Sequence, residues 1–142
     1  MHLSPPHVGV VLLGGIFGTA AREGLTLAVP GIGGFPTTIL AVNIVGAFLL
    51  GLLLESLLRA GHDGGARRTL RLMLGTGFLG GFTTYSTFAV DAVELWGVPG
   101  SGTADPAAGV LLVLATVLAG AVASWAGIAV AARYRPRTEA GS

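Results

Sequence analysis

The chain has 142 residues and a mean hydropathy of +0.78, and 52% of its residues are hydrophobic while only 11% are charged. Soluble domains carry about 25% charged residues, so the composition excludes an ordinary water-soluble domain and predicts a surface covered largely by membrane lipid. The net charge is only +1, and the chain contains no cysteine. Disulfides, cysteine nucleophiles and cysteine-based metal sites are therefore excluded as well.

Four stretches approach the roughly 20 apolar residues that a membrane-spanning helix needs. We predict helices over about residues 8–28, 38–58, 72–95 and 109–132, followed by an arginine-rich tail over residues 133–142. Short loops rich in glycine, proline or charge separate them, and the second of these loops runs from Arg59 to Arg71. The predicted fold class is all-α and integral to the membrane, with residues 1–142 forming a single transmembrane domain.

The first predicted helix carries two glycines at a spacing that suits helix packing. Gly14 and Gly18 lie four residues apart, and therefore on one face of the helix. Lipid supplies no hydrophobic force between helices, so small residues that let backbones approach mark the contacts. We expect Gly14 and Gly18 to pack against another helix, and we expect Arg22 to have a structural role at the helix end.

The second and fourth predicted helices each carry a stripe of small and polar residues spaced four apart. The stripes are Asn43, Ala47 and Gly51 in the second helix, flanked by Gly46, and Thr116, Gly120 and Ser124 in the fourth. Serine and threonine can satisfy their hydroxyl groups on a carbonyl of their own helix. The carboxamide of Asn43 cannot satisfy both of its donors in that way, so we expect it to face a cavity or a partner.

The third predicted helix has the sequence GGFTTYSTF, residues 80–88, at its centre. Glycines and hydroxyls are costly at this depth, because an interrupted helix survives only where protein or a water-filled cavity surrounds it. Such interruptions expose backbone carbonyls that bind ions. We therefore predict that the third helix is broken in mid-membrane, with a candidate cation site of backbone oxygens at Gly80, Gly81, Thr83 and Thr84.

The residues after the predicted break suit a small anion. No lysine or arginine lies in the middle of any predicted span, and conduction needs weak binding that is shared over several sites. Hydroxyls, a carboxamide and the positive edges of aromatic rings meet that need. The candidates after the break are Tyr85, Ser86, Thr87 and Phe88.

All eight basic residues are arginine, and seven of them fall on one side of the predicted bundle. They are Arg59, Arg67, Arg68 and Arg71 around the second loop, and Arg133, Arg135 and Arg137 in the tail. Loops rich in basic residues stay in the cytoplasm. The chain is therefore predicted to be a multi-pass protein of the plasma (inner) membrane with its N- and C-termini in the cytoplasm.

The sequence contains few of the residue patterns that indicate an enzyme. Gly75 to Gly80 spells GxGxxG, but that nucleotide-binding fingerprint requires a strand before it and a helix after it. The three histidines are not spaced as metal ligands, and the predicted spans contain no recognisable catalytic arrangement of serine, histidine and aspartate. We expect no enzymatic activity.

Three segments resemble the CrcB/Fluc family of fluoride channels. GGIFGTAAREGL, residues 14–25, is similar to the family pattern GGxxGAxxR, and TTILAVNIVGAFLLG, residues 37–51, is similar to TLxVNxxGxFxxG. GTGFLGGFTTYSTF, residues 75–88, is similar to GfxGGxTTFSTF. The resemblance implies a passive, fluoride-selective channel that lets toxic cytoplasmic fluoride escape and so lowers its toxicity.

The resemblance also implies an assembly and a set of site residues. Family members are antiparallel dimers of four-helix subunits, with two pores and a central structural sodium ion. The likeness places that sodium on the backbone carbonyls of Gly80 and Thr83 from both subunits, and it makes Gly81 structural. The fluoride pathway that it implies comprises Asn43, Tyr85, Ser86, Thr87, Phe88 and Thr116.

Two positions depart from the family pattern. Tyr85 stands where the family has phenylalanine, which adds a phenolic group to the aromatic site. Gly120, one turn beyond Thr116, has no hydroxyl to extend a polar track along the fourth helix.

The arginine bias conflicts with an antiparallel homodimer, which needs each chain to insert both ways. Two assemblies therefore stay open: the homodimer that the resemblance implies, and a heterodimer with a related chain inserted the other way.

Two other functions also stay open. A small proton-coupled multidrug exporter would need a membrane-embedded carboxylate, for which Glu23 and Glu55 lie near helix ends. A non-conducting membrane assembly subunit would need only the glycine stripes.

Overall fold

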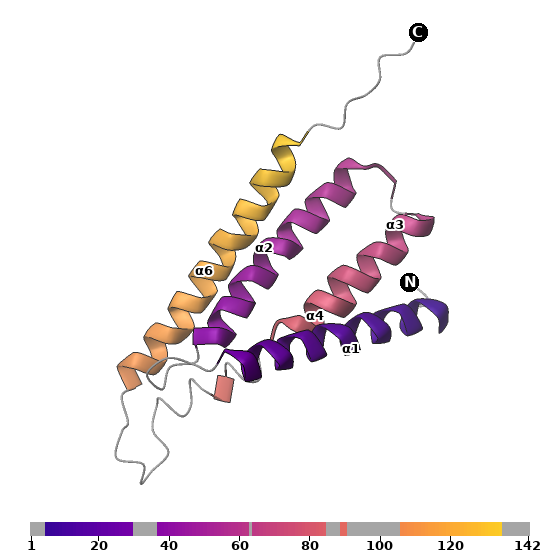
Figure 1. Cartoon of the computed structure of the whole chain (residues 1–142). Helices are drawn as coiled ribbons and strands as arrows, with labels where there is room; N and C mark the ends of the chain where they lie inside the picture. Colours follow the sequence, from indigo (N-terminus) through magenta and orange to yellow (C-terminus); the bar gives the residue numbers. More distant parts are fainter. Residues whose placement is uncertain (1–4, 30–36, 63, 85–88, 91–105, 135–142) are drawn as a thin grey trace.

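The chain forms two packed pairs of helices (Figure 1). A computed structural model describes residues 5–29, 37–62, 64–84, 89–90 and 106–134, and within these ranges every regular element is a helix. The helices are α1 (Pro5–Ala28), α2 (Thr37–Arg59), α3 (Gly65–Leu70), the π-helix η1 (Arg71–Leu79), α4 (Gly80–Phe82) and α6 (Pro106–Arg133). The predicted all-α class is confirmed for this part of the chain.

Among the described residues, three helices are long and apolar enough to cross a membrane: α1, α2 and the Val113–Arg133 part of α6. Two of them begin at a proline, α1 at Pro5 and α6 at Pro106, a few residues before the predicted starts. Proline suits the first helical turn because the amide hydrogens there have no acceptor within the helix. The apolar runs therefore extend into full-length helices without a break at these prolines.

The third predicted helix begins earlier than the sequence indicated. The predicted loop from Arg59 to Arg71 was wrong in its second half, since α3, η1 and α4 form one helical path from Gly65 to Phe82. Alanine, arginine and leucine favour a helix, so helical geometry resumes as soon as the turn after α2 ends. That turn uses Gly61 and Gly65, whose φ angles of 107° and 55° favour glycine.

The middle of this helical path is a π-helix, in which each amide donates to a carbonyl five residues back. It covers the nine residues of η1, RLMLGTGFL. Gly75 and Gly77 are buried within it, with Gly75 facing leucine side chains of α2 and Gly77 lying against the backbone of α1. The π-helix therefore touches both neighbouring helices through positions that carry no side chain.

The first packed pair is α1 with η1 and α4, and glycines bring their backbones together. A β-carbon at Gly14 would collide with the carbonyl oxygen of Met73, and one at Gly18 would collide with that of Phe78. Gly81 belongs to the same seam, because a β-carbon there would press on the backbone of α1. Small residues allow this close approach, and the resulting packing holds the helices together because lipid supplies no hydrophobic force between them.

The second packed pair is α2 with α6. A β-carbon at Gly51 would collide with the carbonyl oxygen of Ser124, and one at Gly127 would collide with that of Phe48. Gly120, in contrast, has open space where its β-carbon would be. The predicted stripe on the fourth helix is therefore wrong at Gly120, and it omits the glycine that does pack, Gly127.

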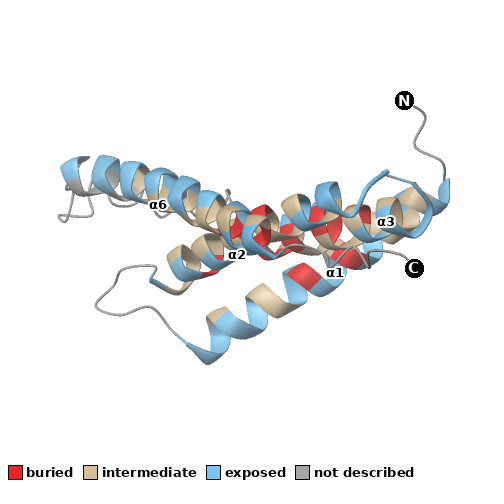
Figure 2. Cartoon of the chain, turned by 90° about the horizontal axis from the view of Figure 1, so that it is seen from above, coloured by how far each residue is buried: buried red, intermediate tan, exposed pale blue. Residues whose placement is uncertain are grey.

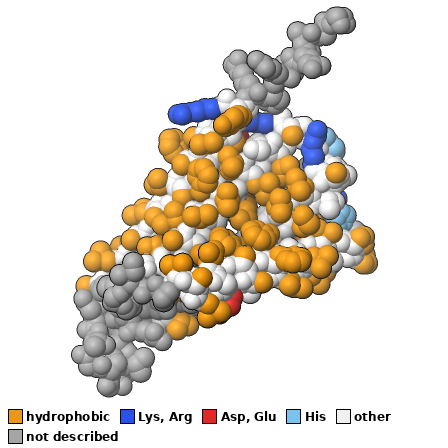
Figure 3. Space-filling view, in the orientation of Figure 1, with side chains coloured by type: hydrophobic (Ala, Val, Ile, Leu, Met, Phe, Trp, Pro, Cys, Tyr) orange, Lys and Arg blue, Asp and Glu red, His pale blue; other side chains and the backbone are white. Residues whose placement is uncertain are grey.

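The chain buries few large side chains and turns most of its apolar surface outward (Figure 2). Among the described residues, the buried hydrophobic side chains are Val42, Leu72, Leu79, Phe82 and Ala131. Phe17 and Trp125 are instead 66% and 69% exposed. In Figure 3, hydrophobic atoms cover the body of the molecule, while basic side chains gather along its upper end and upper right edge. Such an exterior needs lipid or another apolar surface to cover it.

Candidate functional site

The helical path that begins at α3 ends at Phe82, and Thr83 is extended, with φ −79° and ψ 147°. Thr83 still donates two hydrogen bonds to the carbonyl of Leu79, from its N–H at 3.0 Å and from its Oγ1 at 2.8 Å. The chain thus leaves helical geometry within the GGFTTYSTF stretch. The rest of the third predicted helix falls mostly on residues 85–88 and 91–95, outside the described residues, so its predicted break in mid-membrane stays a prediction.

Asn43 of α2 holds the backbone just after this helix end. Its Oδ1 accepts a hydrogen bond from the N–H of Thr84 at 2.9 Å, and its Nδ2 donates one to the carbonyl of Thr84 at 3.1 Å. Thr84 is only 7% exposed, so the two bonds are sheltered. Together they satisfy one acceptor site and one donor of a carboxamide that lies in the apolar middle of α2.

A cleft of about 370 Å³ opens beside this pair of residues. It is bounded by α2, by η1 and the helix end, and by α6, and five predicted site residues meet in it: Asn43, Gly80, Thr83, Thr84 and Thr116. The full lining is Asn43, Gly46, Ala47, Leu50, Gly75, Leu79, Gly80, Thr83, Thr84, Thr116 and Val117. Residues that are far apart in sequence therefore form one cavity at the end of the third helix.

The cleft is uncharged, and its mostly apolar lining holds a few neutral polar groups. Three threonines and one asparagine line it, and none of its lining residues carries a charge. The Nδ2 group of Asn43 has two hydrogens, and the bond to Thr84 uses one of them. Neutral donors hold an anion weakly, and weak binding at several points is what conduction requires.

The other predicted site residues do not line this cleft. Gly14, Gly18 and Gly81 pack α1 against η1 and α4, and the Oγ1 of Thr19 donates to the carbonyl of Gly81 at 3.4 Å. Arg22 is half-buried on α1, and its Nε is buried without a hydrogen bond to any described residue. The remaining predictions lie outside the described residues: Tyr85, Ser86, Thr87 and Phe88.

Sequence reasoning missed one part of the site, the backbone of Thr84 as the partner of Asn43. It named Gly46 only as a neighbour of the small-residue stripe on the second helix. Gly46 is buried and admits Thr83, because a β-carbon at Gly46 would collide with the Cγ2 of Thr83. Gly46 lies three residues after Asn43 and so on a neighbouring part of the same helix face. That spacing was the available signal for Gly46, whereas the backbone of Thr84 has none.

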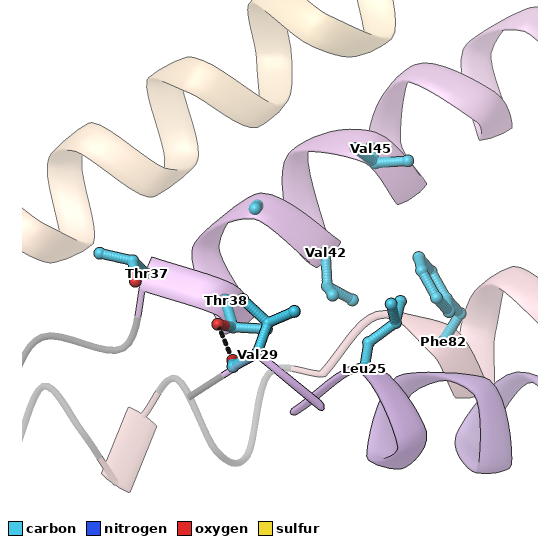
Figure 4. Close-up of a pocket in the computed structure, with 8 residues that line it drawn as sticks. Leu25, Val29, Thr37, Thr38, Val42, Val45 and Phe82 are labelled. Atoms are coloured by element: carbon cyan, nitrogen blue, oxygen red, sulfur yellow. Dashed lines mark hydrogen bonds between the residues drawn. The ribbon is translucent and has the colours of Figure 1, made fainter. Parts of the chain in front are cut away.

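A second cavity, of about 410 Å³, lies between the end of α1, the start of α2 and Phe82 (Figure 4). Leu25, Val42 and Phe82 converge on it, and the Oγ1 of Thr38 donates to the carbonyl of Val29 at its edge. This bond ties the two helix ends together. Its polar lining residues are Thr37 and Thr38, and none of the predicted site residues lines it, so this cavity is a weaker candidate for a conduction site.

Apolar helices of membrane length around an uncharged polar cleft define a multi-pass membrane protein of the channel or transporter class. The sequence pattern of the family described as "CrcB-like protein, Camphor Resistance (CrcB)" matches residues 9–128. The chain therefore belongs to the CrcB family, which confirms the resemblance carried by its three segments.

Three relatives match most of the chain, and their names state an activity. "Fluoride-specific ion channel FluC 2" of Leifsonia xyli subsp. xyli is 46% identical over 132 residues, which cover 93% of this chain and 88% of the relative. "Fluoride-specific ion channel FluC 1" of Cutibacterium acnes is 44% identical over 133 residues, covering 88% and 85%. The Rhodococcus jostii protein of that same name is 41% identical over 128 residues, covering 90% and 87%.

Proposed function

We propose that this protein is a fluoride-specific ion channel that passively exports cytoplasmic fluoride. The observation that carries the proposal is the uncharged cleft in which Asn43, Gly80, Thr83 and Thr116 meet. The names of the relatives support the ion, and they describe channels rather than enzymes. Hydrogen fluoride enters a cell as a neutral acid and dissociates inside, and the inside-negative potential then drives the anion out through the channel.

The proposed fluoride pathway uses neutral donors. Asn43 contributes the second hydrogen of its Nδ2, and Thr116, another residue that lines the cleft, contributes a hydroxyl. Fixed positive charge would hold fluoride too long, whereas these groups bind it weakly enough for it to leave. The pathway continues through the residues that follow the helix end: Tyr85, Ser86, Thr87 and Phe88.

The proposed structural sodium ion sits on the backbone carbonyls of Gly80 and Thr83. In a continued helix, the N–H of Thr84 would donate to the carbonyl of Gly80. Here that N–H donates to Asn43 instead, so the Gly80 carbonyl lacks this helical donor, which supports its use as an oxygen ligand. Hard cations take such carbonyl oxygens, and sodium would supply charge that holds the helix ends of two subunits together.

The proposed assembly is an antiparallel dimer. The exposed apolar side chains of α1 and α6 need cover, and a second subunit and lipid together would provide it. The partner is either a second copy of this chain or a related chain inserted the other way. The proposed location is the inner membrane, with the second loop and both termini on the cytoplasmic side, and the seven arginines of the loop and tail support this orientation by the positive-inside rule.

The exporter alternative finds less support. It needs a carboxylate in the membrane that is available to exchange protons. Glu55 accepts a hydrogen bond from the Nε of Arg59 at 2.6 Å, as one half of an ion pair within α2. Glu23 lines an open groove between α1 and η1 instead of the polar cleft. A non-conducting assembly subunit, in turn, would not need a cleft lined by neutral polar side chains.

Fluoride efflux from liposomes that contain only this purified chain tests the proposal. A fluoride-selective electrode records the loss, and chloride is the control anion. Rapid fluoride loss with chloride retained would support both the channel and assembly of the chain with itself. Efflux that appears only on reconstitution with an oppositely oriented relative would support the heterodimer. Absence of fluoride loss from folded protein in both experiments would contradict the proposed function.

A further inference from the structure

Two residues of α2, Asn43 and Gly46, contact the chain where the helical path of α3, η1 and α4 ends. Asn43 bonds both the N–H and the carbonyl of Thr84. Gly46 leaves the space that the Cγ2 of Thr83 occupies. The backbone therefore leaves helical geometry while both residues at the exit, Thr83 and Thr84, are seated on α2.

The side chain of Thr83 has one orientation that suits both of its contacts. Its Oγ1 donates to the carbonyl of Leu79, and this bond restricts rotation about the Cα–Cβ bond, which is already stiff in a β-branched residue. With the hydroxyl turned to its own helix, Cγ2 points to Gly46. Any β-carbon at residue 46 would push Thr83 away from α2.

The bonds of Asn43 replace those that a continued helix would make. The N–H of Thr84 would donate to the carbonyl of Gly80 in an α-helix, but it donates to Asn43. Neither proline nor a left-handed residue stops the helix among the described residues at this point, because Thr83 has ordinary extended angles. Competition from α2 for the Thr84 amide is therefore the interaction, among the described residues, that can end the helix here.

We propose that Asn43 and Gly46 are positioning residues that fix where the helical path of α3, η1 and α4 ends. Asn43 captures the peptide groups of Thr84, and Gly46 seats Thr83 beside it. The consequence for transport rests on the proposed function: the pair would set the direction in which the Gly80 and Thr83 carbonyls point. The structural role itself does not depend on which ion the cleft carries.

Backbone chemical shifts test the role of Asn43 without a transport assay. In the ¹³C,¹⁵N-labelled full chain in lipid, NMR would compare Thr83 of wild type, which is extended, with Thr83 of Asn43→Leu, which has similar size but no acceptor at residue 43. Once Asn43 no longer competes for the Thr84 amide, the helix can continue, so we expect the Cα shift of Thr83 to move from the extended toward the helical range. Leu79, which lies in η1, is the internal control and should keep its helical shift.

Asn43→Asp separates loss of the bond from loss of folding. It keeps an oxygen where the Thr84 N–H needs one, so Thr83 should keep its extended shift. Helical shifts of Thr83 in Asn43→Leu and extended shifts in Asn43→Asp would support the proposal. Extended shifts of Thr83 in Asn43→Leu, or helical shifts in both variants, would overturn it. Fluoride efflux takes no part in these outcomes, so a failure here is distinct from a failure of the proposed function.

Discussion

The carboxamide of Asn43 and the peptide groups of Thr84 exchange two hydrogen bonds across 41 positions of sequence, at 2.9 Å and 3.1 Å. A carboxamide has the same donor and acceptor as a peptide group, so it can take the place of the next helical turn. The bonds place a polar side chain of α2 at the wall of the cleft and fix the backbone that borders it.

Gly46→Ala should damage the cleft more than its single added methyl group suggests. The new β-carbon would collide with Cγ2 of Thr83, and overpacking of this kind costs roughly 1–3 kcal/mol. We expect a lower thermal unfolding temperature and about a tenfold loss of fluoride efflux. Gly120→Ala is the matched control, because open space surrounds that position. Similar effects of the two substitutions would contradict the prediction.

Thr116→Val should reduce fluoride efflux while preserving the fold. Valine has nearly the shape of threonine and removes the hydroxyl that lines the cleft. A neutral hydrogen bond to the ion would be lost, so we expect efflux to fall about three- to tenfold with chloride still excluded. Thr116→Ser keeps the hydroxyl and should retain most of the flux. Efflux equal to wild type in the valine variant would remove Thr116 from the pathway.

Replacing sodium with a bulky organic cation on both sides of the membrane should lower fluoride efflux several-fold, if carbonyls of Gly80 and Thr83 hold a structural sodium ion. Thr83→Val should show the same dependence on sodium, because the proposed ligand is a main-chain oxygen. That variant loses the bond from Oγ1 to Leu79, which should cost about 1 kcal/mol of stability. Efflux that ignores sodium in both proteins would argue against the proposed ion.

Ser142→Cys would report the orientation of the tail. The chain has no native cysteine, so a membrane-impermeant maleimide would label this position alone. The arginine distribution predicts labelling only from the cytoplasmic side, as for a chain with one orientation and an oppositely inserted partner. Labelling of comparable amounts from both sides would instead favour a homodimer of chains inserted both ways.

The sequence predicted the membrane-spanning parts of the fold well because their signal is local. An apolar run of sufficient length defines α1, α2 and α6. The start of the third helix was missed because Arg67, Arg68 and Arg71 looked like loop, although arginine is compatible with a helix at the membrane edge. A charge count gives the end of the apolar run but not the end of the helix.

The candidate site was only partly predictable. Asn43 stood out because a carboxamide is costly in an apolar helix. Its partner did not, because the groups it bonds belong to the backbone of Thr84, and every residue except proline has the same backbone groups. The choice between Gly120 and Gly127 as the packing glycine of α6 depends on how the two helices cross, which a single stripe of small residues does not specify.

The small buried interior of the described residues affects how the chain responds to chemical denaturants. Chemical denaturants act in proportion to the surface that unfolding newly exposes. Phe17 and Trp125 already face outward in the folded chain, and few large side chains among the described residues are buried. For a single subunit, loss of structure therefore uncovers little new apolar area, and its urea transition should be shallow for a protein of 142 residues. Resistance to urea would then reflect an outward-facing surface rather than strong internal cohesion.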